Sequence, residues 1–119
     1  RGMAIAATKV LDAFPRSNLL FINMLMNITP FCDCWGMTTP AVVPDIGILA
    51  GRDIAAIEAA SLDMVRAEDL IPRSLPPGWD IGGQGHLFER IHHKDPLVIL
   101  GYLEELGGWS RQYSLREVI

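Results

Sequence analysis

Apolar residues form two short continuous runs along the chain, at residues 19–25 and 46–50. Each run has the length of a strand, and only Asn23 interrupts the first one. A continuous apolar run, without alternation of polar and apolar positions, is typical of a strand that is covered on both faces. The pattern therefore predicts two buried strands.

Apolar residues with helical spacing lie before the first run and after the second. Between Met3 and Phe14 apolar residues recur every three or four positions, and Pro15 ends the pattern. After the second run, Asp53 is a suitable N-cap for a helix that extends to about Arg66. The predicted inner face of that helix consists of Ile54, Ile57, Ser61, Met64 and Val65.

The second half of the sequence predicts shorter elements. Residues 71–85 are rich in Pro and Gly and read as a long loop with Trp79 as its anchor. A short helix is predicted at 86–93, and Asp95-Pro96 should start another that ends at Gly107-Gly108. Residues 112–119 alternate in the manner of an edge strand. The fold class is therefore α/β: a small layered domain with buried strands flanked by helices.

Composition favours a domain with a neighbour. The 119 residues fit one domain, spanning 1–119, that can bury a core without disulfides. With 50% hydrophobic and 20% charged residues, we expect part of the apolar surface to meet another domain or subunit, or a second copy. The chain starts with Arg1-Gly2-Met3, which is consistent with part of a larger protein.

Charge and hydropathy exclude two classes of partner. The net charge is −4 and no basic run occurs, whereas nucleic-acid binding needs concentrated Lys and Arg. The apolar stretch at 19–26 is far shorter than the ~20 residues of a bilayer-spanning helix. No signal peptide is recognisable, so a reducing cytoplasm is the expected location.

The two cysteines, Cys32 and Cys34, flank Asp33 between Pro30 and Gly36. Alternate residues of an extended loop point the same way, so both sulfurs could reach one soft metal ion or one edge of an iron–sulfur cluster. Two sulfurs do not complete a tetrahedral site, and the other ligands would come from elsewhere in this chain or from another chain. The pair predicts a metal- or iron–sulfur-associated domain. The alternative is a structural or subunit-interaction domain with inert thiols.

Other polar residues suggest weaker candidates. Asp33, Asp45 and Glu58 could form a carboxylate pocket, which leaves enzymatic activity and catalytic residues open. Glu58 lies on an apolar helical stripe and needs a partner, such as Arg52, or a place in a site. His86, Glu89 and His93 share one helical face as a potential ligand set, with hydrogen-bonded or solvated histidines as the alternative.

Three sequence blocks together resemble a known family. They are ITPFCDC at 28–34, VPDIGILA at 43–50 and DIAAIEAAS at 53–61, and HLF at 86–88, EELG at 104–107 and Tyr113 fit the same pattern. The combination is similar to the carboxy-terminal part of the family called domain of unknown function 362, whose members are longer. Many members carry a ferredoxin-type cysteine motif that is absent here. The resemblance implies an iron–sulfur or metal-linked redox context, with no established activity.

Overall fold

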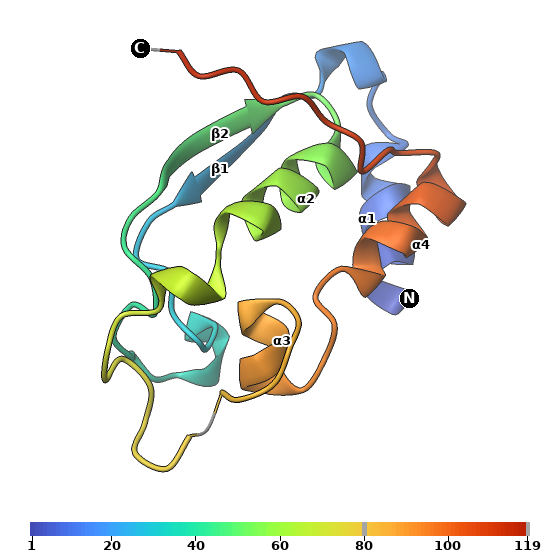
Figure 1. Cartoon of the computed structure of the whole chain (residues 1–119). Coiled ribbons are helices and arrows are strands. Elements are labelled where there is room, and N and C mark those ends of the chain that lie inside the picture. Colours follow the sequence, from blue (N-terminus) through green and yellow to red (C-terminus); the bar gives the residue numbers. More distant parts are fainter. Residues whose placement is uncertain (80, 119) are drawn as a thin grey trace.

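The computed structural model describes residues 1–79 and 81–118, and it has a mixed α/β fold (Figure 1). Over the described residues, two strands and four α-helices are interspersed with three short 3-10 helices. The elements are α1 (Gly2–Leu11), η1 (Arg16–Asn18), β1 (Phe21–Leu25), η2 (Asp33–Trp35), β2 (Gly47–Gly51), α2 (Ile54–Met64), η3 (Ala67–Asp69), α3 (Leu87–His92) and α4 (Val98–Gly107).

The elements stack in layers. Strands β1 and β2 pair antiparallel, in a register that runs from Phe21 opposite Gly51 to Leu25 opposite Gly47. Helix α2 packs on one face of this sheet, and α4 packs on both α2 and α1. Figure 1 shows the sheet, α2, and the α1–α4 pair in succession, with α3 and the long loops at the other end of α2. The predicted layered α/β architecture is confirmed.

A local sequence signal starts α2 as predicted, whereas α4 begins later than predicted. The Asp53 carboxylate accepts hydrogen bonds from the backbone N–H of Ala55 and Ala56, at 2.9 and 3.2 Å, and so caps α2. The Asp95 carboxylate accepts one from the N–H of Leu97 at 2.8 Å, but α4 begins only at Val98, and Leu97, its N-cap residue, makes no side-chain capping bond. The Asp53 cap satisfies N–H groups that have no partner within the helix.

Buried apolar side chains gather in two clusters. The first joins α1, α2 and α4 through Ala4, Ala55, Ala59, Leu100, Leu103 and Trp109. The second lies beneath the long loops and α3, and consists of Val42, Val43, Val65, Leu87 and Ile91. Helix α2 contributes to the first cluster and leads directly into Val65 of the second.

The prediction that both strands are covered on two faces is wrong. Along β1 and β2, half-buried and exposed positions alternate. Phe21, Asn23 and Leu25 face α2, whereas Ile22 and Met24 on the opposite face are 58% and 66% exposed. The physical reason is that helices cover one face of this sheet only. We call the other face, formed by Leu20, Ile22, Met24, Met26 and Ile48, the outer sheet face.

Two further expectations need correction. In α1 the predicted apolar stripe is exposed at Met3 and Val10, and Ala4 and Thr8 are buried instead, because small side chains let α1 approach α4 closely. The tail at 112–118 is not a strand; it runs exposed along the molecule, and residue 119 lies outside the described part. None of the helices in the described residues combines the length and the hydropathy of a membrane-spanning segment.

Candidate functional site

Cys32 and Cys34 lie on one exposed turn. The predicted extended loop is instead the 3-10 turn η2, and Cys32 directly precedes it. The backbone N–H of Cys34 donates to Sγ of Cys32 over 3.5 Å, and the N–H of Trp35 donates to the Cys32 carbonyl over 3.0 Å. The turn therefore holds Cys34 beside the sulfur of Cys32, and both residues are accessible.

An aromatic cluster borders the cysteine turn. The Phe31 ring contacts Trp35, Trp79 and His92, with ring centroids 5.8, 5.4 and 5.8 Å away, respectively. Trp79 thereby anchors the long loop as predicted. These contacts fix the base of the turn against α3 and the loop, although Trp35 itself is exposed.

The candidate ligands do not converge. Among residues 1–79 and 81–118, no three His, Cys, Asp or Glu side chains are grouped in a way that could hold a metal ion. Asp33 begins η2, and its side chain lies outside what the structure describes. The described residues therefore do not provide the four ligands of a tetrahedral metal ion.

The other two candidate carboxylates serve separate structural contacts. Asp45 accepts a hydrogen bond from the backbone N–H of Asn27 at 2.7 Å, in an exposed turn where Asn27 has a φ of 49°. Glu58 is half-buried and accepts from Nδ2 of Asn23 at 3.0 Å. Arg52, the partner suggested for Glu58, instead donates to the carbonyl of Ser17 at 2.7 Å.

His86 is a structural histidine. The N–H of Phe88 donates to its Nδ1 at 3.1 Å, and its Nε2 lies 2.8 Å from the carbonyl oxygen of Leu62. A carbonyl only accepts, so the proton is on Nε2 and both ring nitrogens are engaged. His86 thus caps α3 and ties it to the end of α2, which removes it from the predicted ligand set with Glu89 and His93.

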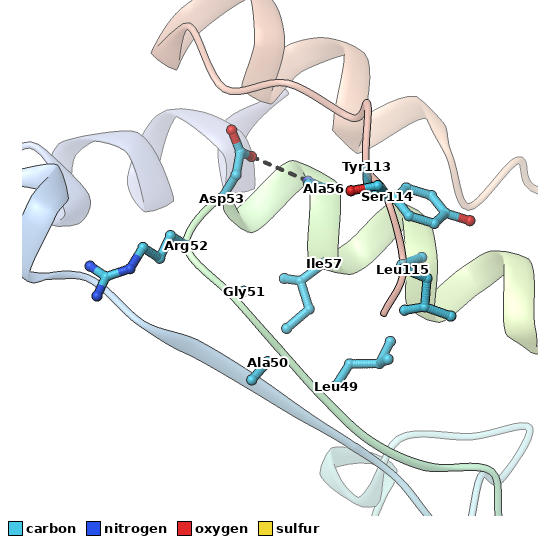
Figure 2. Close-up of a pocket in the computed structure, with 11 residues that line it drawn as sticks. Leu49, Ala50, Gly51, Arg52, Asp53, Ala56, Ile57, Tyr113, Ser114 and Leu115 are labelled. Carbon is cyan, nitrogen blue, oxygen red and sulfur yellow. Dashed lines mark hydrogen bonds between the residues drawn. The ribbon is translucent and has the colours of Figure 1, made fainter. Parts of the chain in front are cut away.

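A groove lies beside β2. Its volume is about 350 Å³, and it is bounded by β2 with the following turn, by α2, and by the tail (Figure 2). The lining residues are Leu49, Ala50, Gly51, Arg52, Asp53, Ala56, Ile57, Ala60, Tyr113, Ser114 and Leu115. This size falls near the lower end of the range of ligand pockets, about 300–1,000 Å³.

Specific contacts hold the tail at the side of the groove. The Tyr113 hydroxyl donates to Asp63 at 2.7 Å, and this bond, with lesser effects of burial and of the Asp63 charge, raises the pKa of Tyr113. The Arg111 guanidinium pairs with Glu104 at 2.7 Å and, with the Arg111 backbone N–H, lowers the pKa of Glu104. The N–H of Ser110 donates to the Asp53 carboxylate at 3.0 Å.

Trp109 positions the start of the tail and was missed by sequence reasoning. It is buried, makes an edge-to-face contact with Phe21 at 6.0 Å, and carries the Arg16 guanidinium 4.0 Å above its ring. Arg16 also donates to the carbonyls of Gly107 and Gly108. The available signal was a tryptophan directly after two glycines that end a helix, since a large ring there tends to fold back onto the core.

No family model matches this chain, and neither a curated protein nor a solved structure is significantly similar to it. The family resemblance of the three sequence blocks therefore stays a prediction. The features of the structure that bear on function are the outer sheet face, the cysteine turn and the groove.

Proposed function

We propose that this chain is a subunit-interaction domain, and that its outer sheet face packs against the same face of a second copy of the chain. The observation that carries the proposal is the exposure of five large apolar side chains on one face of a two-stranded sheet. Exposed apolar patches of this kind mark protein–protein contacts.

The chemistry of the outer sheet face supports a protein partner. It is built from Leu, Ile and Met side chains, and none of its members carries a charge. Unbranched methionines adapt to the shape of an opposing surface. Two copies of a chain with a net charge of −4 could approach through this uncharged face without placing like charges opposite each other. Self-association is thus the simplest form of the interaction.

The experiment compares a double substitution on the outer sheet face with a single control substitution on α1. Ile48 on the outer sheet face and Val10 on α1 are both 64% exposed. Ile48→Thr, combined with Ile22→Thr, removes apolar surface but keeps β-branched residues that suit a strand. Light scattering after size exclusion should show self-association of the unmodified chain and of Val10→Thr, and a shift to monomer in the double variant. An unmodified chain that stays monomeric at all concentrations tested would refute the proposal.

A second candidate function is binding of a soft metal ion or iron–sulfur cluster at Cys32 and Cys34, with further ligands from a partner. It is favoured by the location of both cysteines on one exposed turn, where a backbone N–H points at the Cys32 sulfur. Such a bond favours the thiolate, which is the form that binds metal. A reducing compartment, such as the cytoplasm, would keep both thiols competent for binding.

Anaerobic reconstitution tests this second function. Elemental analysis and visible absorption should detect bound zinc or iron in the unmodified chain, and the Cys32→Ser, Cys34→Ser variant should retain none. Because thiolates must form, retention should decline as the pH falls. Equal metal content in the unmodified chain and the serine variant would contradict the assignment.

A further inference from the structure

The groove beside β2 faces the edge of a strand. Leu49 and Gly51 occupy positions on the α2 side of the sheet and Ala50 lies on the opposite side, yet all three line the groove. Successive side chains of a strand alternate between the two faces of the sheet. These three residues can therefore all line the groove only through the backbone edge of the strand. Among the described residues, β2 pairs only with β1, which leaves its other edge open to this space.

An open strand edge presents a row of N–H and C=O groups that readily accept another extended chain. Proteins use this chemistry to bind peptides: main-chain hydrogen bonds supply affinity, and alternate side chains enter neighbouring pockets. β2 therefore offers the backbone half of a peptide-binding site.

The floor of the groove suits a peptide backbone. It is formed by Ala56, Ile57 and Ala60 of α2, and two of these residues carry only a methyl group. The strand lies close to α2 here: a Cβ at Gly51 would be in van der Waals contact with Cβ of Ile57, at 3.6 Å. Short, uncharged side chains in the floor allow an added peptide to lie deep beside β2. The same floor favours peptides that carry small apolar side chains.

The tail forms the wall opposite β2. Figure 2 shows Tyr113, Ser114 and Leu115 descending beside α2, across the groove from Leu49 and Ala50. The bond from Tyr113 to Asp63 holds this wall in place beside α2. The volume of about 350 Å³ accordingly takes a short extended segment in preference to a folded domain.

We propose that this groove binds a short, extended, uncharged peptide segment of a partner protein, which adds to β2 as a third strand. The binding is independent of the outer sheet face, since the segment contacts the edge of β2 and the floor on α2. Arg52 and Asp53 stand at one end of the site, and they bear its only charges among the described lining residues.

The test begins with a phage-displayed library of random linear peptides, panned against the full chain. Counter-selection uses Ala56→Leu, which places a larger side chain in the floor, and the matched control is Ala6→Leu on the exposed side of α1. Peptides with alternating apolar positions should be enriched on the unmodified chain and on Ala6→Leu, and lose at least about tenfold in affinity on Ala56→Leu, a difference of about 1.4 kcal/mol. Far-UV circular dichroism checks that both variants fold.

A second measurement leaves the protein unchanged. The best peptide is synthesised in two forms, with N-methyl groups on alternate amides along one edge or along the other. One form should lose binding and the other should keep it, because only one peptide edge can bond to β2. Binding should also persist in the Ile22→Thr, Ile48→Thr variant, which separates this site from the outer sheet face.

Three results would overturn the proposal. The first is a library with no peptide enriched on the unmodified chain over Ala56→Leu. The second is equal binding of both N-methylated forms, which would indicate a general apolar contact. The third is loss of binding in the outer-face variant while that variant remains folded, which would place the peptide on the other surface.

Discussion

Replacing Asn23 by alanine should destabilise the packing of α2 on the sheet. Asn23 lies on the inner face of β1, and its Nδ2 donates both to Glu58 at 3.0 Å and to Ser61 at 2.9 Å. Ser61 in turn donates to the carbonyl of Ile57 at 2.7 Å. One amide thus satisfies a carboxylate that lies half-buried between strand and helix.

The magnitude follows from the two bonds that are lost. A hydrogen bond to a charged group contributes about 1.5–3 kcal/mol and a neutral one about 0.5–1.5 kcal/mol. Since the site is only part-buried, water replaces some of this interaction, and we expect Asn23→Ala to lower the free energy of unfolding by about 2 kcal/mol. Urea unfolding monitored by circular dichroism measures it.

A double-mutant cycle isolates the bond to the carboxylate. Asn23→Ala, Glu58→Ala and the double variant should give a coupling energy of about 1 kcal/mol, within the range for residues in contact. Asn18→Ala, at an exposed position in η1, is the control and should change stability by less than about 0.5 kcal/mol. Additive effects of the two substitutions, within about 0.3 kcal/mol, would refute the role assigned to Asn23.

Three further predictions concern the core and the tail. Ile57→Ala should cost about 2–5 kcal/mol in urea unfolding because Ile57 is buried; a loss of a few tenths would show that α2 faces water there. Gly107→Ala should lower the melting temperature, since its Cβ would lie 2.5 Å from Cδ1 of Trp109; an unchanged value would mean that the ring shifts freely. The raised pKa of Tyr113 means that its bond to Asp63 is intact below the ordinary tyrosine pKa of about 10 and is lost as pH rises through the higher folded value. Titration of the Tyr113 ring by NMR should show the raised pKa, and Asp63→Asn should bring the pKa of Tyr113 back toward the ordinary value.

The parts of the fold that sequence predicted are those decided by neighbouring residues. Asp53 was expected to cap α2 and does so through N–H groups two and three positions later. Capping depends on a side chain that reaches the backbone of its own turn, so one sequence suffices to identify it.

The parts that sequence could not predict depend on contacts between distant residues. Glu58 needed a partner, but the partner is Asn23, 35 positions earlier, and not Arg52. An apolar run looks the same whether helices cover one face of a strand or both, so the exposure of Ile22 and Met24 could not be foreseen. The predicted edge strand at the tail failed for the same reason, because the contact of Tyr113 with Asp63 decides its path.

For the candidate site, sequence identified the cysteine turn but not the groove. The closeness of Cys32 and Cys34 follows from their spacing alone. The groove instead requires Trp109 to fold back and the tail to pass α2, which no local pattern encodes. Metal ligands that a partner supplies cannot be predicted from the sequence of this chain alone.

Helix α2 and its end at Val65 join the two buried clusters, and this connection determines how the molecule unfolds. Ala55 and Ala59 belong to one cluster and Val65 to the other, while His86 ties the last turn of α2 to α3. Neither half can melt and leave the other intact, because each would lose the same helix. Heat should therefore unfold the α1–α4 end and the α3 end in a single cooperative transition, with coincident signals from Trp109 and Trp79.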